Sequence, residues 1–219
     1  MTIAAVIFDL DGTLLDTLAD IGESMNEVLA GHGLPVHDIN EYRGFIGDGI
    51  ERLVGRSLVA GGRPENDAAA LIDEFRTVYA ARSTRRTVPY PGIPELLDEL
   101  GDRDLPLSVL SNKPHELTCQ VIDGCLGGVA FRDVRGAGPS TLRKPDPTAG
   151  LEQAGLMGAA PAETLVVGDS GNDMRMARKA GMFGVGALWG FREARELSEG
   201  GADRLIVRPS ELLEIIDGL

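Results

Sequence analysis

The sequence has little cysteine and little histidine, and these shortages exclude two kinds of site. Its two cysteines, Cys119 and Cys125, are six positions apart, which is neither CxxC spacing nor a disulfide framework. We expect both to be reduced thiols in or beside a helix. The three histidines, His32, His37 and His115, are scattered without HxxxH or HxxE spacing. A zinc site would therefore lack its ligand set.

Positive charge and long apolar runs are also missing. Acidic side chains outnumber basic ones by 34 to 21, which gives a formal net charge of -13, and a field of that sign repels a nucleic-acid backbone. No apolar stretch approaches the about 18 residues of a membrane-spanning helix, and the first residues lack the basic segment of a signal peptide. We therefore expect a cytoplasmic protein with no nucleic-acid or membrane partner. We also expect it to be a monomer or a homodimer.

The composition is that of a folded globular protein, with 43% hydrophobic and 25% charged residues in a chain of 219, enough for one or two domains. Short apolar runs at 3–8, 105–110 and 164–167 are typical of strands buried on both faces, and each ends in polar residues. Weaker runs at 183–188 and 205–207 are expected to complete the sheet.

Helical patterns separate these runs. They cover 94–100, 172–180 and the segment after Ser210, and the first two are followed by glycine. Alternating strands and helices predict an α/β fold with a doubly wound, Rossmann-like parallel sheet. Residues 16–85 break the alternation, because they show three amphipathic helical stripes and no buried strand run. We expect residues 1–15 and 86–219 to form the core and residues 16–85 a small helical insert.

Open α/β sheets bind ligands at the carboxyl ends of their strands. We expect the polar residues that end three strands to meet in one crevice, and these are Asp9, Asp11, Ser111, Asn112 and Asp169. Asp9 and Asp11 are two apart and face the same way. Two carboxylates so close resist joint ionisation, which favours one nucleophile or ligand and one proton donor.

Three further features are ambiguous when each is taken alone. Gly168–Asp173 carries two acids four apart, which suit either a capped helix start or, together with Asp9, an all-oxygen site for Mg²⁺. Lys144, between Arg143 and two prolines, is either a solvated loop lysine or the cation that balances these acids. Ser111 and Asn112 form either a turn or a cradle for phosphate, and Gly12 and Thr13 offer further amides and a hydroxyl.

In this order, the motifs resemble those of the haloacid dehalogenase-like hydrolase superfamily. The matching residues are Asp9-Leu-Asp11-Gly12-Thr13, Ser111, Lys144 and Gly168-Asp169 through Asp173. The resemblance spans the chain and implies a Rossmann-like core with a helical cap inserted after the first motif. The cap would correspond to residues 16–85.

That resemblance also implies a role for each residue in a Mg²⁺-dependent phosphatase. Asp9 would be the nucleophile that takes the phosphoryl group, and Asp11 would protonate the leaving oxygen and later activate water. Ser111 and Lys144 would hold the phosphate oxygens. The implied metal ligands are Asp9, Asp169 and the carbonyl of Asp11, with Asp173 in support.

The runs Arg43–Gly49 and Ser111–Pro114 look more specifically like those of phosphoglycolate phosphatases. This predicts 2-phosphoglycolate as the small phosphorylated substrate, with Arg43 and the amides around Gly47 and Gly49 binding its carboxylate. Alternatives are a phosphatase of another small metabolite, a sugar-phosphate mutase and a dehalogenase. A receiver-like phosphoaspartate signalling module is the alternative outside enzymes.

Overall fold

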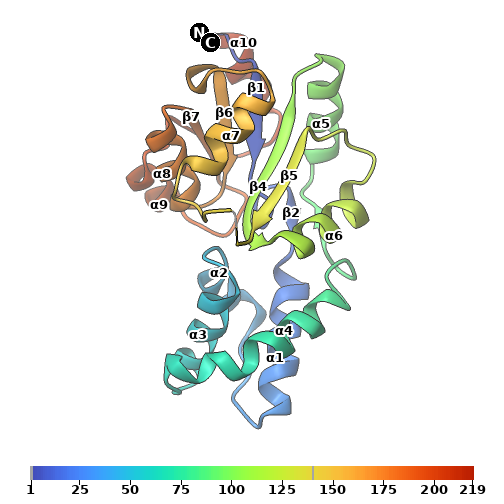
Figure 1. Ribbon diagram of the computed structural model, residues 1–219, viewed down its shortest axis with the longest axis vertical. Helices are drawn as coiled ribbons and strands as arrows, with labels where there is room; N and C mark the ends of the chain where they lie inside the picture. The colour runs from blue at the N-terminus through green and yellow to red at the C-terminus, as the bar shows by residue number, and fades with distance from the viewer. Residues whose placement is uncertain (1, 140) are drawn as a thin grey trace.

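A six-stranded parallel sheet forms the centre of the protein in the computed structural model, which describes residues 2–139 and 141–219 (Figure 1). Its strand order is β5-β4-β1-β6-β7-β8. The strands are β1 (Ala5–Phe8), β4 (Leu107–Pro114), β5 (Asp133–Ala137), β6 (Thr164–Gly168), β7 (Phe183–Ala187) and β8 (Arg204–Ile206). The sequence-based prediction of a doubly wound α/β core is confirmed.

Helices cover both faces of the sheet because the strands bury side chains on both. Along β1, Val6 and Phe8 pack in one apolar cluster with residues of α5, α6 and α10, whereas Ala5 and Ile7 pack in another with residues of α7 and α8. This is the alternation expected of an extended strand. The core helices are α5 (Ile93–Asp102), α6 (His115–Leu126), α7 (Thr148–Leu156), α8 (Gly171–Ala180), α9 (Ala194–Gly200) and α10 (Glu211–Gly218).

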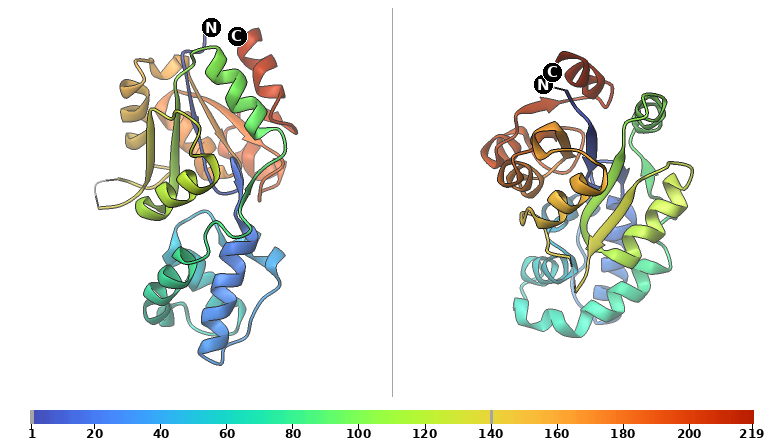
Figure 2. Two further views of the ribbon diagram at one scale, coloured as in Figure 1. Left: turned by 90° about the vertical axis from the view of Figure 1, so that its right-hand side faces the viewer. Right: turned by 45° about the horizontal axis from the view of Figure 1, so that its top comes forward.

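Between β1 and α5 the chain forms a helical cap that lies at one end of the core (Figure 2). Its helices are α1 (Leu18–Gly31), α2 (Tyr42–Phe45), α3 (Ile50–Ala60) and α4 (Ala69–Ala80). They share their own apolar cluster, in which Met25, Leu29, Val54 and Phe75 are buried. The two chain termini lie together at the opposite end of the core (Figure 1).

A short antiparallel pair joins the cap to the core. Strand β2 (Leu15–Asp16) pairs with β3 (Val88–Pro89) where the chain leaves the core and returns to it. The carboxylate of buried Asp20 accepts main-chain hydrogen bonds from Arg86 and Thr87 at 2.8–3.1 Å. These contacts tie the first cap helix to the returning strand.

The sequence patterns did not predict every element. Strand β5 was missed because Asp133 and Arg135 interrupt its apolar residues, as an edge strand allows. The five predicted strands are all present. Both cysteines lie on α6 as free thiols, as expected. No helix in the described ranges is long and apolar enough to cross a membrane.

Candidate active site

The site lies at the carboxyl ends of the three central strands. Strand β1 lies between β4 and β6, so Asp9 after β1 is flanked by Ser111 in β4 and by Asp169 after β6. All three line one cavity, which contains about 640 Å³ of empty space including its open mouth. The structure thus brings together residues more than 150 positions apart, at the edge where such sheets bind ligands.

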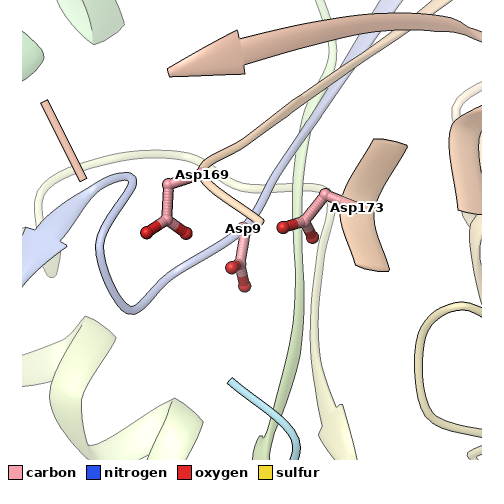
Figure 3. A group of neighbouring side chains, drawn as sticks. All are labelled: Asp9, Asp169 and Asp173. Atoms are coloured by element: carbon pink, nitrogen blue, oxygen red, sulfur yellow. The ribbon is translucent and has the colours of Figure 1, made fainter. Parts of the chain in front are cut away.

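Three carboxylates converge at this edge of the sheet (Figure 3), and two of them, Asp9 and Asp169, line the cavity. One oxygen each of Asp9, Asp169 and Asp173 lies within 4.8 Å of the others. The Lys144 ammonium contacts two of them, at 2.7 Å from Asp9 Oδ1 and 2.6 Å from Asp173 Oδ1. It also donates to the Leu110 carbonyl at 2.7 Å. Lys144 is therefore the internal cation of an otherwise acidic cluster.

Burial and mutual repulsion make this cluster unfavourable without more positive charge. Burial, and then the charge of Asp173, raise the pKa of Asp9 to about 7 although Lys144 opposes the shift. Burial and the charge of Asp9 hold the pKa of Asp169 well above its usual range. Burial thus favours the protonated form of Asp9 while no metal is bound, and a cation beside it would favour the carboxylate that attack on phosphorus requires.

The donor set fits a small hard cation. Carboxylate oxygens are the ligands that Mg²⁺ prefers, and Asp9 and Asp169 each keep coordination sites beyond their protein contacts. Asp173 differs, because one of its oxygens pairs with Lys144 and the other accepts hydrogen bonds from the Ser170 amide and hydroxyl at 3.1 and 2.5 Å. Its side chain is thus well placed to fix Lys144, and its part in metal binding stays a prediction.

Glycines allow the backbone to approach Asp169 closely. A Cβ on Gly12 would lie 2.2 Å from Asp169 Oδ2, and Gly12 also has a φ of +88°. A Cβ on Gly190 would lie 2.3 Å from Asp169 Cβ. The Phe191 amide donates to Asp169 Oδ2 at 2.7 Å, so this carboxylate is held in place by main chain on two sides.

Asp11 has a partner that the sequence motifs did not assign. Lys113 Nζ lies 2.5 and 2.8 Å from the two carboxylate oxygens of Asp11, and its side chain is only 4% exposed. Burial lowers the pKa of Lys113, but attraction by Asp11 outweighs burial and keeps the ammonium charged. The Asp11 carboxylate is not part of the acidic cluster, so any metal role remains with its carbonyl, as the resemblance implied.

Asn112 does not present its amide to a ligand in the way the phosphate-cradle prediction requires. Its side chain accepts from the Lys144 amide at 2.8 Å and donates to the Lys144 and Gly47 carbonyls at 3.0 Å each. It therefore connects the Lys144 loop with the cap. Ser111 lines the cavity, and its hydroxyl accepts a hydrogen bond from the Lys113 amide at 3.2 Å.

Of the three cap residues expected to bind substrate, two line the cavity and one does not. Gly47 and Gly49 line the cavity. Arg43 does not: its guanidinium donates to the Gly190 carbonyl at 3.0 Å and lies over the Phe191 ring. The Arg43 guanidinium is thus engaged with the Gly190 carbonyl and with the Phe191 ring at the cavity wall, and its binding of the substrate carboxylate stays a prediction. Thr13 also lies outside the lining, and its hydroxyl is 3.5 Å from Asp169 Oδ1.

Sequence reasoning missed several residues of the cavity wall. Tyr79 belongs to one of the three amphipathic stripes of residues 16–85, yet it lines the cavity beside Lys113. Arg192 also lines it and donates to the Arg43 and Ile46 carbonyls. A signal existed for Lys113, since it lies two positions after Ser111 on an extended strand and so faces the same way. No local pattern marked Tyr79 or Arg192.

Comparison with known proteins agrees with this arrangement. A family model described as haloacid dehalogenase-like hydrolase matches residues 6–187. The chain belongs to this family. The resemblance inferred from the four motifs is thereby confirmed, and so is the expectation of a hydrolytic enzyme.

The relatives are phosphatases. Phosphoglycolate phosphatase from Caulobacter vibrioides is 34% identical over 192 residues, which cover 87% of this chain and 81% of the relative. Phosphoglycolate phosphatase from Aquifex aeolicus is 31% identical and covers 97% and 96% of the two chains. The crystal structure of a predicted phosphoglycolate phosphatase from Haemophilus somnus 129pt has a TM-score of 0.88 at 26% identity, with 98% of each chain covered. This protein is thus a phosphatase-type member of the family.

Proposed function

We propose that the protein is a Mg²⁺-dependent phosphomonoester hydrolase that works through a phosphoaspartyl intermediate on Asp9. The observation that carries the proposal is the Asp9 carboxylate, which lies in a cavity at the end of β1 between the Lys144 ammonium and the buried Asp169. A bound Mg²⁺ would be held by Asp9, Asp169 and the Asp11 carbonyl. It would neutralise charge on the transferring phosphoryl group.

The first step is attack by an Asp9 carboxylate oxygen on phosphorus. A bond forms between this oxygen and phosphorus, the bond between phosphorus and the ester oxygen breaks, and Asp11 gives a proton to that leaving oxygen. Lys144 and Ser111 hold the phosphate oxygens. Lys144 is suited to this role because Asp173 and the Leu110 carbonyl fix its ammonium beside Asp9.

The second step regenerates Asp9. Asp11 removes a proton from water, the water oxygen bonds to phosphorus, and the phosphorus bond to Asp9 breaks to release phosphate. The cap keeps bulk water away from the acyl phosphate while the first product leaves. We propose residues 16–85 as this cap, with its ends at the β2–β3 pair.

As substrate we propose 2-phosphoglycolate, with glycolate and phosphate as products. Two observations support a small leaving group of this kind. The cavity wall contributed by the cap is mainly apolar, with Ile21, Ile50 and Leu53 facing the polar strand ends, and it offers few partners to the hydroxyl groups of a sugar. The relatives from C. vibrioides and A. aeolicus also bear the name of this activity.

The test is a phosphate-release assay on purified protein with Mg²⁺. The substrates are 2-phosphoglycolate, ethyl phosphate, β-glucose 1-phosphate, pyrophosphate and a nucleoside monophosphate. The proposal predicts the highest kcat/KM for 2-phosphoglycolate and loss of all activity in Asp9→Asn. A tenfold preference for another substrate, or transfer of phosphate between sugar positions, would overturn the substrate. Activity of Asp9→Asn above about 1% of the wild type would overturn the mechanism.

A further inference from the structure

The cavity contains a positive group that the phosphoryl chemistry does not use. Three cationic side chains line the cavity within the described part of the chain, and these are Lys113, Lys144 and Arg192. Lys144 is engaged with Asp9 and Asp173. The Arg192 guanidinium contacts the Arg43 and Ile46 carbonyls and Glu196. Lys113 is the remaining cation that can meet a second anionic group of a substrate.

The position of Lys113 matches the leaving group rather than the phosphate. Its ammonium contacts both oxygens of Asp11, the residue that would protonate the leaving oxygen. Whatever is bonded to that oxygen must therefore lie beside Lys113. In a phosphorylated 2-hydroxy acid the carboxylate is only two bonds from the ester oxygen. An ammonium group has three N–H donors, so Lys113 can hold Asp11 and a substrate carboxylate together.

The cap provides a second polar group at the same place. Tyr79 of α4 lies with its ring centroid 4.9 Å from Lys113 Nζ. Its hydroxyl is buried beside this ammonium, which can only donate to it, and the hydroxyl proton has no acceptor within the described residues. Burial raises the pKa of Tyr79 to about 12, so the hydroxyl keeps its proton at neutral pH and can donate it. A buried donor without an acceptor is costly, and a ligand oxygen at this point would accept the hydroxyl proton.

We propose that Lys113 of the core and Tyr79 of the cap form the site for the carboxylate of the leaving group. This proposal rests on the proposed phosphatase function. It assigns selectivity for short phosphorylated hydroxy acids to Lys113 and Tyr79 and not to Arg43. The neighbouring cap side chains Ile21, Leu53 and Phe75 are apolar. These three side chains offer a carboxylate no hydrogen-bond donor.

The experiment compares two substrates that differ mainly in the carboxylate, 2-phosphoglycolate and ethyl phosphate, in the presence of Mg²⁺. The measured quantity is the ratio of their kcat/KM values. Because a hydrogen bond to a charged group is worth about 10- to 150-fold, Lys113→Met is expected to lower the ratio by about that factor. Tyr79→Phe should lower it by about 2- to 10-fold. Lys113→Arg keeps the charge and should retain most of the ratio.

Arg43→Met is the matched control, because it removes a cation near the cavity that does not line it. Its ratio should equal that of the wild type. Tyr79→Phe and Lys113→Arg keep the test decisive should Lys113→Met fold poorly.

Equal loss of activity on both substrates in the Lys113 and Tyr79 variants would show that these residues only orient Asp11 or the cap, and would overturn the proposal. A lower ratio of kcat/KM values in Arg43→Met alone would overturn the proposal and would assign the substrate carboxylate to Arg43. A wild-type enzyme that hydrolyses both substrates without preference would refute the carboxylate site and leave the phosphatase intact. A wild-type enzyme that hydrolyses neither would instead refute the proposed function.

Discussion

Lys144→Met would remove a buried positive charge from the acidic cluster of Asp9, Asp169 and Asp173. The ammonium contacts Asp9 and Asp173, and its side chain is 4% exposed. Replacing one partner of a buried ion pair leaves an uncompensated charge and costs about 3–5 kcal/mol. We therefore expect Lys144→Met to lower the free energy of unfolding by about 3–5 kcal/mol near pH 8 without divalent ions.

The loss of stability in Lys144→Met should be larger at high pH than at low pH. Burial raises the pKa of Asp9 in the folded protein to about 7, well above its usual 3.8. Stability linked to such a group is complete below the unfolded pKa and is lost as pH rises through the folded pKa. Without Lys144 the pKa of Asp9 should rise further. The difference in stability between wild type and Lys144→Met should therefore be smaller near pH 5 than near pH 8.

Urea unfolding of both proteins at the two pH values, followed by circular dichroism, measures this difference. Lys179→Met is the control, since Lys179 is exposed on α8, and its loss should be within about 0.5 kcal/mol at both pH values. A loss below about 1 kcal/mol in Lys144→Met at both pH values would show that Lys144 does not balance the acidic cluster.

Three further predictions address the metal, the close backbone approach and the cap contact. Burial and repulsion raise the pKa values of Asp9 and Asp169, so both acids are more fully ionised near pH 8 than near pH 5. Mg²⁺ should therefore raise the melting temperature more near pH 8 than near pH 5. An equal rise at the two pH values would contradict a site formed by these acids. Gly12→Ala should lower the free energy of unfolding by more than about 1 kcal/mol in chemical unfolding and should also weaken Mg²⁺ binding. The alanine Cβ would meet Asp169, and the φ of Gly12 is +88°. A wild-type free energy of unfolding together with wild-type Mg²⁺ affinity would contradict the tight contact. Asn112→Ala should lower kcat by about tenfold or more, because it removes the bonds to Lys144 and Gly47; unchanged steady-state kinetics would mean that this link does not position Lys144.

The sequence predicted the sheet and the meeting point of the strand ends for a shared physical reason. Buried parallel strands appear as short apolar runs, and their carboxyl ends lie at one edge. Asp9, Ser111 and Asp169 each follow or end such a run, and the structure brings them to one cavity. The edge strand β5 was not predicted, because an edge strand tolerates polar residues and so lacks the continuous apolar run of a buried strand.

The cap side of the cavity was harder to predict because it depends on how two units pack together. A helical stripe shows that Tyr79 faces inward, but not that its hydroxyl reaches the cavity beside Lys113. Arg43 was chosen for its charge, yet its direction is set by the Gly190 carbonyl in the core. Asn112 was expected at the phosphate, whereas contacts with Lys144 and Gly47 use its amide. These orientations come from tertiary contacts that no local pattern encodes.

The most direct test of the central claim is to locate the phosphoryl group on the protein during turnover. Asp11→Asn should still permit attack by Asp9 but slow release of phosphate, since it lacks the group that activates water, an effect of about 10²- to 10⁴-fold. The variant is mixed with 2-phosphoglycolate and Mg²⁺, quenched in acid, digested and analysed by peptide mass spectrometry. The account predicts a phosphorylated peptide modified at Asp9, absent from the double variant that also carries Asp9→Asn. Phosphorylation at another residue, or rapid hydrolysis of substrate by the Asp9→Asn single variant, would contradict it.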